Sequence, residues 1–175
     1  MTDLRYPIGR YQRPEAFTAE TRRRAFEALA LLPRELAAAV GGLDAAQLDT
    51  PYRDGGWTVR QLVHHVPDSH LNAYVRHRLC VTEENPTVLA YDENAWVATP
   101  EIASGDVAVP LALAAAVHAR WVGFLRALPE AAFARTFVHP ATGKVWSLDD
   151  SVEMYAWHGR HHVAHVTALR ERRGW

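Results

Sequence analysis

Cysteine, net charge and long apolar runs are all scarce in this sequence of 175 residues. Its only cysteine is Cys80, so the chain can form no internal disulfide and is compatible with a reducing compartment. Cys80 lies in the apolar stretch RLCVT, which favours a buried thiol over a nucleophilic one. The formal net charge of -1 gives no electrostatic basis for binding nucleic acid, so we expect no such partner.

Segments that would direct the chain to a membrane are missing as well. No apolar run approaches the length of a transmembrane helix, and the N-terminal stretch MTDLRYPIGRYQRPE lacks the apolar core of a signal peptide. Hydrophobic residues make up 49% of the sequence and charged residues 22%, which is typical of a folded globular chain. We therefore expect one domain over residues 1–175 and no membrane partner.

Helical periodicity and capping residues predict four substantial helices. The capping box Thr58-Val59-Arg60-Gln61 opens one of them, and Ser147 caps the last. The helices are expected at residues 19–32, with a second short segment at 34–40, and at residues 58–82, 110–128 and 147–173.

Two prolines are expected to disturb these helices. Pro33 should end the first helix and open the short segment that follows it. Pro67 removes the backbone hydrogen bond to the Val63 carbonyl, so we expect a kink there, with a true break at Val66 as the alternative.

The remaining segments contribute little regular structure. Residues 1–17 resemble an extended arm, residues 85–105 are irregular with a short turn near 93–96, and residues 136–139 and 144–146 flank a turn and predict a small hairpin. The expected fold class is therefore an all-α four-helix bundle, whose facing helices can hold a metal in the core. The expected core includes Leu113, Val117, Trp121, Phe124, Leu125 and Leu128, together with the tryptophans Trp57, Trp96, Trp146 and Trp157.

Histidine is concentrated in two short windows, which hold eight of the ten histidines. The first window contains His64, His65, His70 and His77, and the second contains His158, His161, His162 and His165. The second window, WHGRHHVAH, places His158 and His162 one helical turn apart on the same face. Two imidazoles at this spacing can chelate one divalent metal ion.

A third ligand is expected from the first window. On the last helix, a stripe that contains Tyr155 and Leu169 carries His158 and His162 toward the bundle interior. On the other helix, His65 shares one side with Leu62, Ser69 and Asn72, whereas His64 lies about 100° away. His65 is therefore the predicted third ligand.

Other interpretations stay open. A buried histidine is often a hydrogen-bonded structural residue, and His161 and His165 form a competing pair. Three imidazoles buried together favour a metal, because burying their cations would cost several kcal/mol each. Gly159 occupies the place of the glutamate in the H-E-x-x-H motif, which disfavours a zinc peptidase. Asp68 is either a partner that orients an imidazole or a solvated carboxylate.

Residues outside the two windows offer weaker indications. His139 is expected to be an ordinary loop histidine. Four arginines either ring the mouth of the site and hold an anionic substrate or lie on a solvated surface: Arg53, Arg60, Arg76 and Arg160.

Nearly the whole chain resembles the YfiT proteins, within the wider DinB-like superfamily of four-helix bundles. The long segment LDTPYRDGGWTVRQLVHH, residues 48–65, is the most specific part of the resemblance. The other parts are Tyr6-Pro7-Ile8-Gly9, Asp68-Ser69-His70, Tyr91-Asp92-Glu93 with Ala95-Trp96, Val138-His139-Pro140 and residues 157–165.

The resemblance implies a divalent metal held by three histidines, which match His65, His158 and His162 in this sequence. It also implies one zinc or nickel ion per subunit, a cytoplasmic location and a homodimer. The family has been described as candidate metal-dependent hydrolases that act on small molecules. Some relatives transfer a low-molecular-weight thiol such as bacillithiol to an electrophile.

Three protein ligands leave a coordination position open, which is typical of a catalytic metal site. Water activated there gives hydrolysis, and a thiol activated there gives thiol transfer. Hydrolysis needs a nearby proton shuttle, so the glycine at position 159 favours the thiol on chemical grounds alone. The rivals from other classes are a non-catalytic bundle whose metal is fully ligated by protein and a bundle that binds haem through buried histidines.

Overall fold

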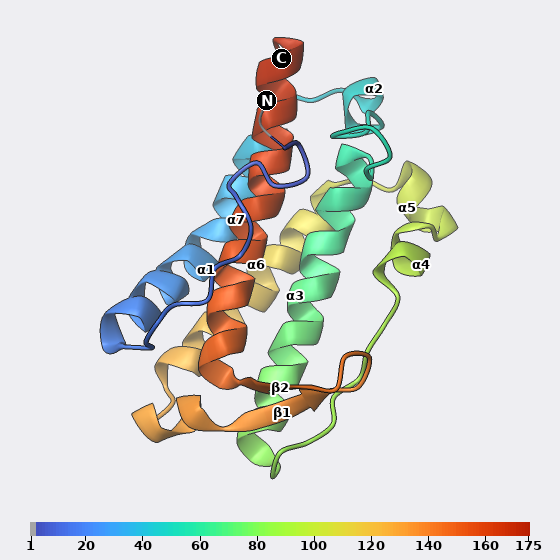
Figure 1. Ribbon diagram of the computed structural model, residues 1–175. Helices are drawn as coiled ribbons and strands as arrows, with labels where there is room; N and C mark the ends of the chain where they lie inside the picture. The colour runs from blue at the N-terminus through green and yellow to red at the C-terminus, as the bar shows by residue number, and fades with distance from the viewer. Residues whose placement is uncertain (1–2) are drawn as a thin grey trace.

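Four long helices form the body of the protein in the computed structural model, which describes residues 3–175 (Figure 1). They are α1 (Ala19–Val40), α3 (Val59–Thr82), α6 (Ala108–Arg126) and α7 (Leu148–Arg173). Both α1 and α3 pack against α6 and α7, so that α1 lies diagonally opposite α3 across the bundle. The predicted all-α four-helix bundle is confirmed.

Shorter elements connect the long helices. They are α2 (Ala45–Leu48), α4 (Glu93–Val97), α5 (Pro100–Ser104), the 3-10 helix η1 (Glu130–Ala134) and the antiparallel strands β1 (Thr136–His139) and β2 (Lys144–Ser147). The predicted hairpin is confirmed, and α4 forms at the expected turn, whereas α5 and η1 were not expected. Backbone hydrogen bonds from Val88 to Val138 (3.0 Å) and from Val138 to Pro86 (2.9 Å) fix the segment before α4 against the hairpin.

The first helix does not end at Pro33, so that prediction is wrong. α1 runs without interruption to Val40, because Leu32 and Leu36, on either side of the proline, are fully buried in the core. Packing of this apolar face outweighs the hydrogen bond that the proline removes. α3 likewise continues through Pro67, so the alternative of a true break at Val66 is not seen.

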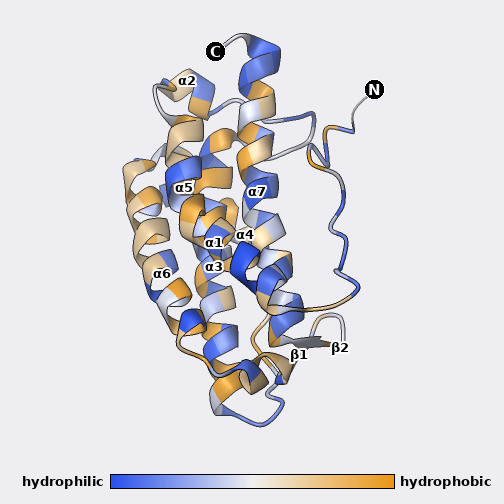
Figure 2. Ribbon diagram, turned by 90° about the vertical axis from the view of Figure 1, so that its left-hand side faces the viewer, coloured by the Kyte–Doolittle hydropathy of each residue, from blue (hydrophilic) through white to orange (hydrophobic). Residues whose placement is uncertain are grey.

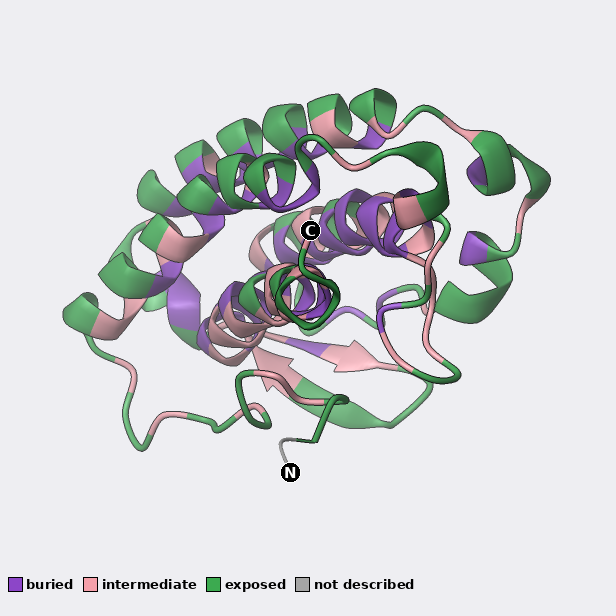
Figure 3. Cartoon of the chain, turned by 90° about the horizontal axis from the view of Figure 1, so that it is seen from above, coloured by how far each residue is buried: buried purple, intermediate pink, exposed green. Residues whose placement is uncertain are grey.

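A layer of histidines divides the hydrophobic core into two clusters. One cluster, toward the hairpin, contains Trp121 and Leu148, and the other, toward α2, contains Leu36 and Leu62. The helices turn their buried faces inward (Figure 3). His70, on α3, lies between Val66 of one cluster and Ala73 of the other and bonds His118 and His158, whereas His77 lies within the hairpin-side cluster against Trp121. Two apolar layers thus enclose a polar one.

By length and composition alone, α6 could cross a membrane, with a mean hydropathy of 1.5 (Figure 2). This corrects the expectation that no segment approaches such a span. In the bundle, Trp121 and Leu125 on α6 are fully buried among the other helices. Leu113 was expected in the core but is 38% exposed, because the inward face of α6 passes through Ala114 and Val117.

Cys80 is fully buried, as predicted, and burial raises the pKa of its thiol to about 11. The burial of the tryptophans is less uniform than expected. Trp121 is fully buried and Trp96 is 43% exposed, whereas the remaining three of the expected set are partly buried. The prediction was therefore wrong for Trp96, which packs against Tyr91 beside α4 with the ring centroids 4.5 Å apart.

The predicted N-terminal arm, described from residue 3 onward, contains no helix or strand and lies along α7 (Figure 1), although turns at residues 4–5 and 7–8 interrupt its extended path. The Tyr6 ring centroid lies 6.0 Å from that of His161, and the Tyr11 ring centroid lies 5.9 Å from that of Trp157. Arg13 forms an ion pair with Asp150. The arm thus covers the face of α7 that carries His161.

Gly159 sets the distance between α1 and α7, and a side chain there should destabilise the fold. A Cβ atom at this position would lie 2.5 Å from the Cδ2 atom of Leu32, which is 1% exposed and cannot move away freely. We expect Gly159→Val to lower the free energy of unfolding by about 1–3 kcal/mol in urea denaturation. Gly123→Val is the matched control, because a Cβ atom there meets nothing within 4 Å and the change should stay within about 0.5 kcal/mol. Equal effects of the two substitutions would contradict this account.

Candidate metal centre

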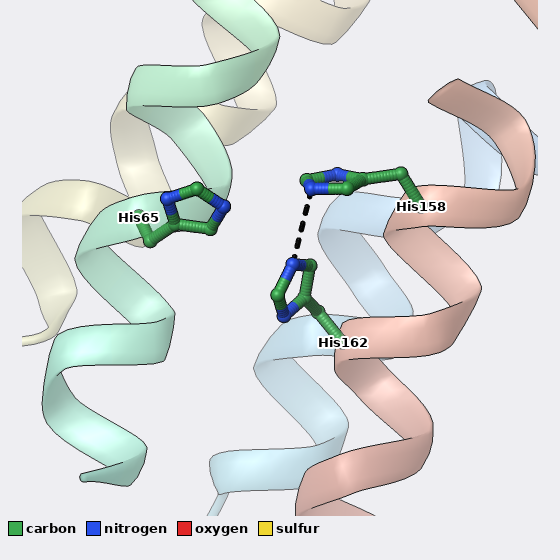
Figure 4. Close-up of side chains that lie close together, drawn as sticks. All are labelled: His65, His158 and His162. Carbon is green, nitrogen blue, oxygen red and sulfur yellow. Dashed lines mark hydrogen bonds between the residues drawn. The ribbon is translucent and has the colours of Figure 1, made fainter. Parts of the chain in front are cut away.

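His65, His158 and His162 come together between α3 and α7 (Figure 4). One ring nitrogen from each of the three lies within 4.8 Å of the others. The Nε2 atoms of His158 and His162, one turn apart on α7, are 3.1 Å from each other. The His65 ring centroid lies 5.5 Å from that of His158 and 5.0 Å from that of His162. The structure thus brings together the three histidines that the sequence singled out.

Burial keeps these imidazoles neutral. It lowers the pKa of His65 to about 4 and places the pKa values of His158 and His162 well below the ordinary value, with the neighbouring histidines adding to the effect. A neutral imidazole offers the lone pair that a metal ligand needs.

The donor set fits a divalent metal. Nitrogen ligands about 2.0–2.1 Å from a tetrahedral zinc ion lie about 3.3 Å apart, close to the 3.1 Å between the Nε2 atoms of His158 and His162. The Nδ1 atom of His162 is buried without a hydrogen-bond partner among the described residues. Nδ1 of His162 can therefore carry the ring proton without losing a protein contact, which leaves Nε2, the atom beside His158, to bind the metal.

The cluster forms part of the wall of a cavity of about 550 Å³. Trp57 packs against His65 with the ring centroids 4.6 Å apart, and loop residues 52–57 and 90–94 and the hairpin turn complete the wall. A smaller cavity of about 270 Å³, lined partly by Phe137, Trp146 and Met154, adjoins the first at Arg76, His139 and Tyr155. The hairpin thus places His139 in the cavity wall, which corrects its expected role as an ordinary loop histidine.

The competing pair, His161 and His165, lies outside this cavity. Their Nε2 atoms are 3.0 Å apart, and His165 packs against Tyr52 with the ring centroids separated by 4.2 Å. Within residues 3–175, no third metal-ligating side chain joins the pair to form a cluster.

Asp68 is half-buried on α3, but its carboxylate hydrogen-bonds to no histidine in the described part of the chain. Burial raises the pKa of Asp68, and the nearby Glu101 raises it further. The expected orienting role of Asp68 therefore has no contact to support it. His64 lies close to Gly105, away from the cluster, in line with its 100° offset.

The four arginines separate into two groups. Arg53 and Arg76 line the cavity. Arg60 instead bonds the Asp49 carboxylate and the Gly105 carbonyl, both at 2.7 Å, and Arg160 is exposed and does not line it. Arg60 thus links the segments that carry Asp49 and Gly105 by hydrogen bonds, whereas Arg53 and Arg76 give the cavity its positive charge.

His77 and Ser151 lie 2.8 Å apart but do not form a nucleophilic pair. The indole N–H of Trp121 donates to the Nδ1 atom of His77 at 3.0 Å, so the proton of the neutral ring is on Nε2. That Nε2–H donates to the Ser151 oxygen and cannot accept its proton. The arrangement stabilises the core and supplies no general base.

Comparisons with known proteins identify the family. The model of the DinB superfamily matches residues 28–166, so the chain belongs to this superfamily. A relative from Bacillus mycoides is 48% identical to this chain over 175 residues, which cover 100% of both chains. YfiT from Bacillus subtilis is 44% identical over 173 residues, which cover 99% of this chain and 97% of YfiT. Both relatives are named as candidate metal-dependent hydrolases.

The solved structure of Bacillus subtilis YfiT has a TM-score of 0.96 to this chain, with 44% identity and 99% of each chain covered. It is described as a probable metal-dependent hydrolase with an unusual four-helix bundle topology. The resemblance to the YfiT proteins that the sequence suggested is confirmed.

The buried His77 should make stability depend on pH. Burial lowers the pKa of His77 to about 3, so the native ring stays neutral while the unfolded one takes up a proton near pH 6.5. This stability is fully present above pH 6.5 and is lost as the pH falls toward 3. Between pH 7.5 and 5.5 we expect His77 to account for a loss of about 1 kcal/mol in urea denaturation of the metal-free protein. His77→Gln should show a correspondingly smaller difference between the two pH values, and an unchanged difference would contradict the assignment.

Proposed function

We propose that this protein is a metal-dependent hydrolase that holds one divalent ion per subunit, Zn²⁺ or Ni²⁺, through His65, His158 and His162. The observation that carries the proposal is the convergence of three neutral imidazoles, two of them buried and His158 partly buried, within 4.8 Å at the wall of a cavity large enough for a small molecule. The names of the relatives point in the same direction.

When bound, the ion would supply Lewis-acid chemistry that lowers the pKa of a water or thiol beside it toward neutrality. The protein contributes the binding geometry. His158 and His162 are rigidly spaced by one helical turn, and Trp57 packs against His65. The open cavity beside these residues leaves room for a substrate, which supports a catalytic site over a fully ligated structural one.

The charge of the cavity favours a substrate with an anionic group. Arg76 is only 8% exposed, and no carboxylate of the described residues forms an ion pair with it. It donates to the Leu89 carbonyl at 2.8 Å and the Tyr155 hydroxyl at 3.3 Å, and its Nε atom has no partner. A buried guanidinium without a counter-ion is costly, and a substrate carboxylate would supply that counter-ion.

Thiol transfer is the second candidate, and the scarcity of carboxylates in the cavity favours it. Glu93 is the only carboxylate among the lining residues of the described chain, and Gly159 occupies the position of the H-E-x-x-H glutamate. In this reaction the thiol sulfur forms a bond to carbon, the leaving group departs with its electron pair and the thiol proton passes to solvent. No proton shuttle to a leaving amine or alkoxide is required.

Removal of a cluster histidine should remove the metal. We expect the wild type to bind one zinc or nickel ion per chain in titration calorimetry and elemental analysis. His65→Ala and His162→Ala should each weaken binding by a hundredfold or more, because a single ligand is lost from three. His161→Ala is the matched control, since His161 lies on the same helix but outside the cluster, and its affinity should match the wild type. Metal binding retained in both cluster variants would refute the proposed site.

The reaction can be tested with paired substrates. We expect turnover of small esters that stops when the metal is removed and that favours esters carrying a carboxylate over neutral analogues. Arg76→Met should raise KM for the anionic ester by about tenfold and leave the neutral one little changed, because a charge-assisted hydrogen bond contributes about 1.5–3 kcal/mol. If the protein consumes a thiol and an electrophile in a metal-dependent reaction but does not turn over esters, the hydrolase proposal is refuted and thiol transfer takes its place.

A further inference from the structure

A hydrogen-bonded chain of histidines crosses the bundle and ends at the candidate metal cluster. It starts at the Leu29 carbonyl on α1, which lies 2.6 Å from the Nδ1 atom of His118 on α6. The Nε2 atom of His118 lies 3.0 Å from the Nδ1 atom of His70 on α3, and the Nε2 atom of His70 lies 3.0 Å from the Nδ1 atom of His158 on α7. Each of the four long helices contributes one member.

The first acceptor of this chain exists because of a proline. In an α-helix, the carbonyl of residue 29 normally accepts a hydrogen bond from the N–H of residue 33. Residue 33 is Pro33, which lies inside α1 and has no N–H to donate. The Leu29 carbonyl is thereby left without its helical partner in a fully buried position, and His118 supplies the missing donor.

The direction of every bond in the chain follows from this one acceptor. A carbonyl oxygen can only accept, so the Nδ1 atom of His118 carries the proton and its Nε2 atom carries a lone pair. His70 must then donate through Nδ1 and accept through Nε2. His158 in turn donates through Nδ1, so its Nε2 atom carries a lone pair, which accepts from the Nε2 atom of His162 at 3.1 Å in the metal-free protein and can bind a metal in its place.

Neither water nor rotation of the rings offers an alternative. His70 and His118 are 0% and 1% exposed, and a charged imidazole at such depth would be strongly disfavoured. The His70 ring packs edge-on against Trp121 and Tyr155, with centroid distances of 5.7 and 5.3 Å. The reverse direction would set the bare Nδ1 atom of His118 against the Leu29 oxygen at 2.6 Å, which is repulsive.

We propose that His70 and His118 are positioning residues that hold His158 in the tautomer with a free Nε2 lone pair, and that Pro33 provides the acceptor that anchors them. The inference rests on the proposed function in one respect, namely that His158 is a metal ligand. Partners of this kind fix the tautomer and ring orientation of metal-binding histidines, and their loss typically costs 10–100-fold in metal affinity.

The tautomer can be measured in the metal-free protein by long-range ¹H–¹⁵N correlation spectra of the imidazole rings. In the wild type we expect His70, His118 and His158 all to carry their proton on Nδ1. In His118→Phe the acceptor for His70 is gone, so His70 can donate through Nε2 instead and move the proton of His158 to Nε2. An unchanged Nδ1–H tautomer of His158 in this variant would overturn the proposal.

Metal affinity is the second readout. His118→Phe should bind zinc 10–100-fold more weakly than the wild type. His118→Gln is the conservative variant, because its amide N–H can donate to the Leu29 carbonyl while its amide oxygen accepts from His70, and it should restore the Nδ1–H tautomer and most of the affinity. Zinc affinity equal to the wild type in His118→Phe would contradict a positioning role.

Pro33→Ala separates positioning from folding. An alanine N–H would compete with His118 for the Leu29 carbonyl, so zinc affinity should fall while the free energy of unfolding stays the same or rises. A fall in stability without loss of affinity would indicate a purely structural proline. If the wild type binds no metal, the proposed function fails, whereas the tautomers of the metal-free protein still decide whether the chain is directed as argued.

Discussion

A neutral imidazole buried between helices must find partners for two different nitrogens, one that donates and one that accepts. The buried histidines of the bundle meet this requirement in several ways. His77 hydrogen-bonds Trp121 through one nitrogen and Ser151 through the other. His70 and His118 bond each other, and the second nitrogen of His118 donates to the Leu29 carbonyl. At the far end of that sequence of bonds, His158 and His162 face each other and the cavity. The polar layer is thus satisfied by protein at one end and open to a ligand at the other.

Two residues that are unfavourable in a helix interior support this arrangement. Pro33 removes a hydrogen bond from α1 and thereby frees the Leu29 carbonyl that His118 uses. Gly159 lacks a side chain next to His158 on α7, and the Leu32 side chain occupies the space where its Cβ atom would be. Both features lie where α1 faces the histidine layer. The close approach of α1 and α7 and the direction of the histidine bonds are therefore set by two residues that helix propensity alone would count as unfavourable.

Local signals in the sequence predicted four helices, the caps Thr58 of α3 and Ser147 of α7, and the hairpin, because each depends on residues close together in the chain. The choice of His65 over His64 followed from helical geometry, and the structure places these two residues on different sides of α3 as expected. The continuation of α1 through Pro33 depends on packing between helices, which no local pattern reports.

The histidine chain was missed for a related reason. His118 stands alone on an apolar helix, outside both histidine windows, so nothing in its neighbourhood sets it apart from an ordinary core residue. Its partner is a backbone carbonyl on a helix 89 residues away in sequence. A proline inside a helix signals a free carbonyl four residues earlier, but the sequence does not say which side chain will reach it.

The groups that line the cavity limit which reactions it can support. Among the described residues, two guanidinium groups, Arg53 and Arg76, and one carboxylate, Glu93, line the cavity, so it is positively charged even before a metal adds to it. Burial raises the pKa of Tyr91 to about 12, so its hydroxyl stays protonated at neutral pH. Burial and the Arg76 charge lower the pKa of His139, whose ring is therefore neutral and able to accept a proton. A hydrolase would have to route protons through His139 or Glu93, both contributed by the segments that cover the bundle. The long helices provide the three histidine ligands and the cavity residues Ser69, Arg76 and Tyr155. The choice between hydrolysis and thiol transfer thus lies in the hairpin and the α4 segment and not in the bundle core.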